Sequence, residues 1–177
     1  MKTSTRICAI FMVIIIASMF IAVPVFAQNT NVRKANLQKM YMDYLVTEGY
    51  APKIDPDGDV MFKREGRLYF IFVDETDPMY FSVALGLWSV DTEEEMLKVV
   101  LAAHYTNVRT KVCKIFTAGK IVWVGVQIFV ASPENFKSTF ERSLSSIDSG
   151  VAVFTSLLQQ KSDPGSTSLG MPRIIKD

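Results

Sequence analysis

Residues 49–73 read GYAPKIDPDGDVMFKREGRLYFIFV. Gly49 is typical of a residue that ends a helix, because glycine adopts the left-handed conformation without strain. The Asp- and Gly-rich residues that follow favour a turn. Beyond them the pattern predicts two strands, Val60 to Lys63 and Leu68 to Val73, joined by a tight turn at Glu65-Gly66. The stretch therefore predicts a sheet-forming domain, and it contains no catalytic motif.

The residues before Gly49 predict a helix. Apolar side chains recur there at steps of three and four, which places them on one helical face: Leu37, Met40, Tyr41, Tyr44 and Leu45. A short polar lead-in, Gln28 to Asn31, is expected before this helix.

The residues after Val73 alternate between strand and helix signals. A third strand is expected from Tyr80 to Trp88. Thr92-Glu93-Glu94-Glu95 is typical of a helix start, because the threonine and glutamate side chains satisfy its free N–H groups. The apolar arc of that helix is wide, which predicts that it packs flat on a sheet. Two more strands are expected, Thr110 to Phe116 and Ile121 to Val130.

The last helix is expected to begin with Ser132 as its N-cap and Pro133 in its first turn. Its apolar stripe keeps helical spacing past Gly150, which predicts one continuous helix to about Gln160. Residues 161–177 are rich in Pro, Gly and Ser and predict a disordered tail.

The order helix, three strands, helix, two strands, helix predicts an α+β fold. We expect an antiparallel sheet of about five strands with helices packed on one side. Residues 28–160 are the right length for a single domain of this class.

The first 27 residues read as a secretory signal. Lys2 and Arg6 give a positive start, Ile7 to Val23 is apolar and uncharged, and Val25-Phe26-Ala27 fits a cleavage site. We expect cleavage between Ala27 and Gln28, which leaves a periplasmic or secreted chain with no membrane attachment. The alternative is an uncleaved N-terminal membrane anchor, because the apolar run is at the short limit of a membrane span.

The charge and the cysteine content argue against a nucleic-acid-binding protein and against a disulfide-stabilised one. The whole chain has a net charge of +1, and loss of Lys2 and Arg6 with the signal would make it −1, so electrostatics gives no reason to expect nucleic-acid binding. Cys113 is the cysteine left after cleavage, so no intramolecular disulfide can form. Its apolar neighbours predict a buried thiol. A reactive thiol or an intermolecular bridge is the alternative.

Candidate chemical sites in the sequence are weak. Asp55-Pro-Asp57-Gly-Asp59 resembles the start of a calcium loop, but the sixth position is Val60 and the twelfth is Gly66 where the loop needs glycine and a bidentate acid. We therefore expect a turn and no metal site. His104, the single histidine, has no partners at zinc-ligand spacing and is expected near a helix end. No catalytic or cofactor-binding residue is predicted.

Aromatic residues are the more suggestive feature. On the last strand Trp123 and Phe129 lie opposite a ladder of valines, so they either pack under a helix or form a partner-binding face. The last helix would span about 40 Å, more than one sheet covers. We therefore predict a homodimer to which Val151, Phe154 and Leu158 contribute. A further protein partner, of unknown identity, is also expected.

The amino-acid sequences of several segments resemble those of the YbjN-domain family, which is assigned provisionally to bacterial sensory transduction. The resemblance rests on YAPKIDPDGD from Tyr50, FKREGRLYFIFVDE from Phe62, TKV from Thr110 and SPENF from Ser132. It spans Leu37 to Leu158. It implies a fold like that of type III secretion chaperones, which are commonly dimers, and it supplies no active-site residues.

These observations favour an exported, non-enzymatic protein-binding module, chaperone-like or regulatory, in the periplasm or envelope. No cofactor or metal is expected. One alternative is an enzyme whose site is assembled only by folding. The other is a membrane-tethered scaffold, which requires that the signal is not cleaved.

Overall fold

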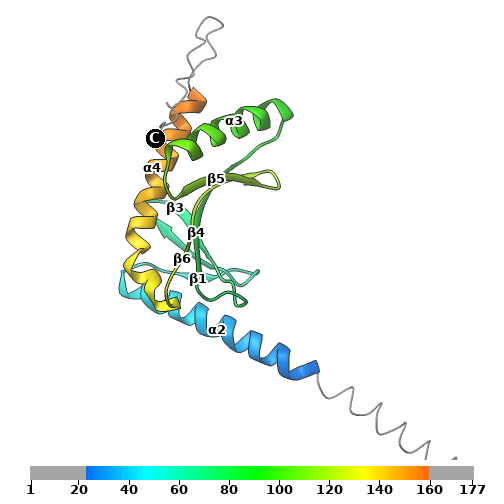
Figure 1. Ribbon diagram of the computed structural model, residues 1–177, viewed down its shortest axis with the longest axis vertical. Helices are drawn as coiled ribbons and strands as arrows, with labels where there is room; N and C mark the ends of the chain where they lie inside the picture. The colour runs from blue at the N-terminus through cyan, green and yellow to red at the C-terminus, as the bar shows by residue number, and fades with distance from the viewer. Residues whose placement is uncertain (1–22, 160–177) are drawn as a thin grey trace, which may run out of the picture. The chain divides into compact units, whose positions relative to one another are not determined.

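The computed structural model describes the backbone of residues 23–159 and the side chains of residues 31–159. Most of the predicted signal and the predicted tail lie outside these residues. Figure 1 shows the elements in chain order: α2 (Val23–Thr47), β1 (Lys53–Ile54), β2 (Val60–Arg64), β3 (Arg67–Phe72), β4 (Tyr80–Ser89), α3 (Glu93–Arg109), β5 (Cys113–Ala118), β6 (Ile121–Phe129), the 3₁₀ helix η1 (Pro133–Ser138) and α4 (Phe140–Gln159).

The strands form one antiparallel sheet in the order β1-β2-β3-β4-β6-β5, with helices on one side. The predicted α+β class and the order of the main elements are therefore confirmed. The sheet has six strands where about five were expected. The added strand is β1, in which Lys53 pairs with Met61 and Ile54 with Val60. Two residues are too few to produce a recognisable alternation, so the sequence pattern missed it.

The hairpin predicted at Glu65-Gly66 is confirmed. β2 and β3 pair in register, with Phe62 opposite Tyr69 and Arg64 opposite Arg67. Both turn residues have positive φ, 51° at Glu65 and 78° at Gly66. This is the combination that suits the twist of a two-residue hairpin turn.

The end of α2 is also as predicted. The amide of Gly49, at φ 86°, donates to the carbonyl of Val46, and the amide of Tyr50 donates to the carbonyl of Leu45. These two bonds close the last turn in the manner of a glycine-terminated helix. The predicted polar lead-in is wrong, because Gln28 to Asn31 lie within α2, which extends back to Val23.

The last helix differs from the prediction in its first turns. Pro133–Ser138 is a 3₁₀ helix, Ser132 makes no side-chain cap, and the α-helix begins only at Phe140. Two bonds of the tighter i→i−3 type, from Asn135 to Ser132 and from Thr139 to Phe136, explain the break. The apolar stripe predicted on this helix has these fully buried members: Phe136, Phe140, Leu144, Ile147 and Phe154.

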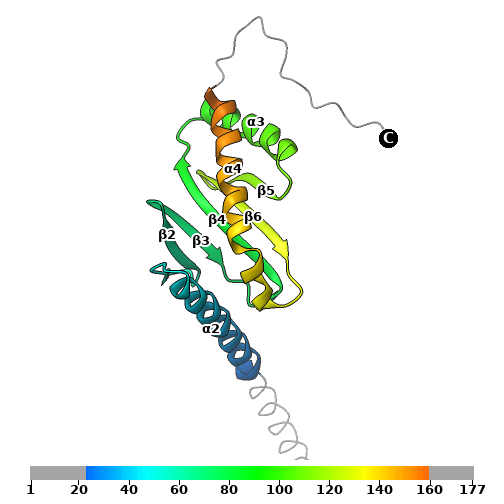
Figure 2. The same cartoon turned by 90° about the vertical axis from the view of Figure 1, so that its left-hand side faces the viewer.

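Within the described residues, the chain divides into two compact units, 23–84 with 127–141 and 85–126 with 142–159. The single domain expected over 28–160 stays a prediction. The core of the first unit is aromatic. Ring centroids lie 4.8 Å apart for Tyr41 and Phe136 and 5.4 Å apart for Phe81 and Phe136. Figure 2 shows α2 beside β2 and β3 in this unit.

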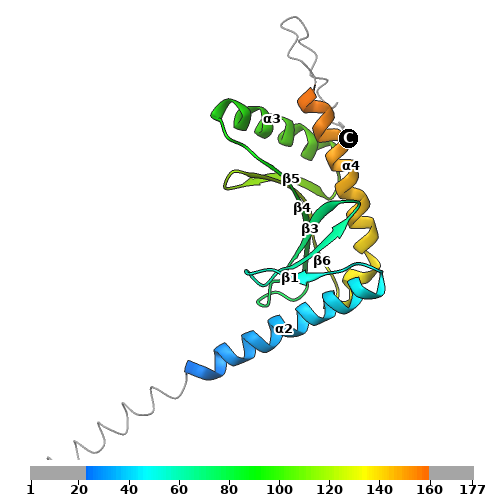
Figure 3. The same ribbon diagram turned by 180° about the vertical axis from the view of Figure 1, so that it is seen from behind.

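The core of the second unit lies where α4 crosses β5 and β6. Gly150 of α4 faces Cys113 of β5 and Val124 of β6, and all three are buried. β5 is an edge strand, and α3 lies next to it in Figure 3. Asn107 of α3 accepts a hydrogen bond from the Ile115 amide at 2.7 Å and donates one to the Ile115 carbonyl at 3.1 Å. The amide side chain thus satisfies part of the free strand edge.

Candidate functional site

The first unit exposes the sheet face that its helices leave uncovered. Along β3, Tyr69 and Ile71 are buried, while Leu68 is exposed and Phe70 and Phe72 are half-buried. Since side chains alternate across a strand, the second set lies on the opposite face from the core. Leu68, Phe70 and Phe72 therefore point away from the helices.

Tyr80 of β4 and Phe129 of β6 belong to the same face. Each is out of phase with the large buried side chains of its strand, and their ring centroids lie 5.7 Å apart. The rings of Phe70 and Phe72 stack at 6.5 Å. We call Leu68, Phe70, Phe72, Tyr80 and Phe129 the aromatic face.

Phe129 is the most exposed large apolar side chain in the described part of the chain, at 78%. The two small residues of β4 on this side of the sheet, Ser82 and Ala84, are buried. The large side chains thus form an outer layer over the strands and leave Phe129 projecting. An exposed aromatic ring set in an apolar layer is characteristic of protein–protein contact sites.

The other residues predicted for a surface lie in the second unit, and Phe154 is not exposed. It is fully buried and stacks on Trp88 of β4, with ring centroids 5.8 Å apart. A partner can therefore reach Val151 and Leu158, which are half-buried, but not the Phe154 ring. The homodimer stays a prediction.

Trp123 of β6 is half-buried, and its ring lies over Gly86 of β4. A Cβ at Gly86 would be 3.4 Å from the indole. Gly86 therefore makes room for a tryptophan on the neighbouring strand. This packing holds Trp123 against the sheet and leaves part of the ring accessible.

Helix α3 presents an apolar stripe that sequence reasoning assigned to the core. The exposed members, led by Leu97 at 62%, recur at helical spacing: Leu97, Val100, Leu101 and Val108. The buried residues of α3 are small by comparison: Val99, Ala102, Ala103 and Thr106. The expectation that α3 packs its wide apolar arc flat on the sheet is wrong, because only this narrow side is covered.

The predicted helix start at Thr92 is confirmed, and it also fixes a tryptophan. The Thr92 hydroxyl accepts a hydrogen bond from the Glu95 amide at 3.2 Å. The Glu95 carboxylate accepts bonds from the Asp91 amide at 3.3 Å and the Trp88 indole N–H at 3.1 Å. Glu95 is thereby engaged in fold contacts.

The Asp-rich turn is confirmed as a structural turn. The Asp55 carboxylate accepts bonds from the amides of Asp57 and Asp59, and the Asp59 carboxylate accepts one from the Val73 amide at 2.7 Å. Desolvation raises the pKa of Asp59, although the Val73 bond opposes the shift. One carboxylate oxygen of Asp55 and one of Asp59 thus stabilise the backbone of the turn.

His104 and Cys113 lie on different elements, α3 and β5. His104 is exposed on α3, with its ring 5.4 Å from that of Tyr105. Cys113 is a buried free thiol, and burial raises its pKa to about 11. The thiol is therefore protonated at neutral pH.

The described residues contain no group of three or more His, Cys, Asp or Glu placed to hold a metal ion. Over the same part of the chain, no helix combines the length and apolar character needed to cross a membrane.

Comparison with known proteins gives one informative result. No protein-family model matches the chain, and no curated protein matches its sequence. Among solved structures, it is similar to a crystal structure of YbjN from E. coli, whose assignment as a transcription regulator is provisional. The TM-score is 0.50 at 12% sequence identity, and the match covers 67% of this chain and 89% of YbjN. The YbjN-like fold implied by the sequence is thus confirmed.

Proposed function

We propose that this chain is an exported, non-enzymatic protein-binding module, chaperone-like or regulatory, that acts in the periplasm or at the envelope. The observation that carries the proposal is the exposure of Phe129 within the aromatic face. Burial of such a ring against a partner contributes about 1.5–3 kcal/mol. The regulatory role provisionally assigned to YbjN is in keeping with a binding function.

The aromatic face suits an extended apolar segment of a partly folded protein. Its rings already pack on one another, in the pairs Phe70–Phe72 and Tyr80–Phe129, so little side-chain freedom is lost on binding. Its five members carry no charge, and Lys63, exposed opposite Leu68 on the next strand, begins a polar rim. An apolar centre with a polar rim is the usual anatomy of a protein interface.

We expect the protein to suppress aggregation of a model unfolded client, reduced α-lactalbumin, followed by light scattering. Phe129→Ser should weaken this suppression several-fold, because it removes the projecting ring without touching the core. The matched control is Val46→Ser on α2, which removes another side chain that is more than half exposed, at 59%. Equal suppression by both variants and the wild type would show that the aromatic face does not bind clients.

Export is the second part of the proposal. Its support is the charged start, apolar run and Val25-Phe26-Ala27 of the sequence. N-terminal sequencing of the protein recovered from the periplasm is expected to give Gln28 as the first residue. Recovery of chains that begin at Met1, whether in the cytosol or in the membrane, would remove the export assignment.

A further inference from the structure

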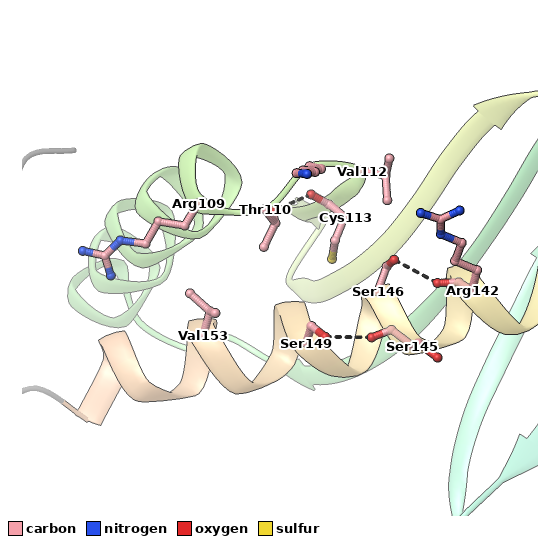
Figure 4. A pocket seen from close by; sticks show the side chains of 10 residues that line it. Arg109, Thr110, Val112, Cys113, Arg142, Ser145, Ser146, Ser149 and Val153 are labelled. Carbon is pink, nitrogen blue, oxygen red and sulfur yellow. Dashed lines mark hydrogen bonds between the residues drawn. The ribbon is translucent and has the colours of Figure 1, made fainter. Parts of the chain in front are cut away.

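The second unit contains a cavity of about 370 Å³ between the C-terminal end of α3, the start of β5 and the middle of α4. Figure 4 shows Arg109 and Arg142 at opposite ends of it, with Cys113, Ser146 and Ser149 between them. Its volume falls within the range of small-molecule sites. None of the residues of the aromatic face lines it.

The charged side chains that line the cavity are all cationic, and all three are exposed. Arg109, Lys111 and Arg142 line it, and no lining residue is acidic. Two exposed lysines elsewhere pair with a carboxylate on their own helix, Lys39 with Asp43 and Lys98 with Glu94 at 2.7 Å. Within residues 31–159, no carboxylate lies within ion-pair distance of the three lining cations. Three like charges around one hollow raise the local concentration of anions.

The neutral part of the lining defines the rest of the ligand. The hydroxyls of Ser146 and Ser149 donate to the carbonyls of Arg142 and Ser145, each at 2.9 Å. The cationic side chains are therefore the donors available to a bound anion. Val112 and Val153 supply apolar surface.

We propose that this cavity binds a small organic oxyanion, with its carboxylate or phosphate at the Arg142 guanidinium and its apolar body against Val112 and Val153. A guanidinium binds either group through two parallel hydrogen bonds. Lys111 and Arg109 strengthen the electrostatic attraction of the anion without contacting it, because a charge near a surface hollow acts beyond contact distance.

The test is calorimetric titration of the whole protein at low salt with octanoate, octyl phosphate, inorganic phosphate and octanol. Saturable binding is expected for octanoate or octyl phosphate, at least several-fold tighter than for inorganic phosphate, and none for octanol. Comparison of octanoate with octyl phosphate identifies the headgroup. Arg142→Gln should weaken binding by about tenfold or more, the loss of one charged hydrogen-bonding pair.

Lys137→Gln is the matched control, since Lys137 is an exposed cation that does not line the cavity. It should bind like the wild type. Three results would overturn the proposal: no saturable binding of either octyl anion, unchanged affinity in Arg142→Gln, or octanol binding as tightly as octanoate. Binding to vesicles of anionic lipid without binding of the monomeric anions would also overturn it, and would indicate a membrane surface instead.

Discussion

Replacement of Phe154 by alanine is expected to lower the free energy of unfolding by about 3–5 kcal/mol, the usual effect of removing a buried phenyl ring. The Phe154 side chain is fully buried and stacks on Trp88, which in turn donates a hydrogen bond to Glu95. The cavity left by the ring would loosen this attachment between α4, β4 and the start of α3. Urea denaturation followed by tryptophan fluorescence measures the change.

Phe129→Ala is the matched control for this measurement. The substitution is the same, but the Phe129 ring is largely exposed, so the change in unfolding free energy should stay within about 0.5 kcal/mol. From the sequence, Phe154 was predicted to contribute to a dimer surface, and Phe129 was expected either under a helix or on a partner-binding face. Similar losses in the two variants would contradict the placement of Phe154 in the core.

Gly150→Ala is the second large effect expected, and its sign depends on Cys113. A Cβ at position 150 would overlap the Cys113 sulfur, and the next nearest atoms are the Cys113 Cβ at 3.4 Å and the Val124 Cγ1 at 3.5 Å. Forcing an extra methyl group into a packed contact costs about 1–3 kcal/mol. The greater helix propensity of alanine, about 1 kcal/mol, does not fully offset this loss.

The Cys113→Ala background provides the control. Without the sulfur, the added methyl group meets its neighbours at ordinary contact distance. Gly150→Ala should then be neutral or stabilise by up to about 1 kcal/mol, the propensity term alone. If alanine at 150 destabilises both backgrounds equally, the sulfur is not the obstacle. Thermal or urea unfolding of the four proteins completes this double-mutant cycle.

Local signals in the sequence were enough to predict much of the fold. Gly49, the Glu65-Gly66 turn and the Thr92 cap each depend on a residue type whose backbone preference is strong. The stripe from Phe136 to Phe154 was predicted from spacing alone. Its buried members are large and regular, so tertiary context did not override the pattern.

The errors arose where the neighbour of an element decides the outcome. The apolar residues of α3 were assigned to the core, but only small side chains such as Ala102 and Ala103 are covered, and Leu97 is exposed. Hydropathy spacing identifies an apolar face without showing whether anything packs on it. Phe154 was misplaced for the reverse reason, because its partner Trp88 lies on a strand far away in the sequence.

The candidate sites were harder still to predict. Phe129 was proposed from its alternation with the valines of β6, which is a local signal. Arg109, Lys111 and Arg142 gave no signal, because they are brought around one cavity only by the packing of α4 against the start of β5. The role of Gly150 could not be predicted either. In the sequence it is a residue that weakens a helix, whereas in the structure it gives α4 the space to pack closely against Cys113.

Binding of other proteins by the aromatic face can be observed directly with a label at Phe129 itself. Phe129 is replaced by 4-fluorophenylalanine, and its fluorine resonance is followed by NMR while reduced α-lactalbumin is added. We expect a saturable shift or broadening at position 129 and no change for the same label at the buried Phe154. An unchanged Phe129 resonance under conditions in which the protein suppresses aggregation of the client would contradict it.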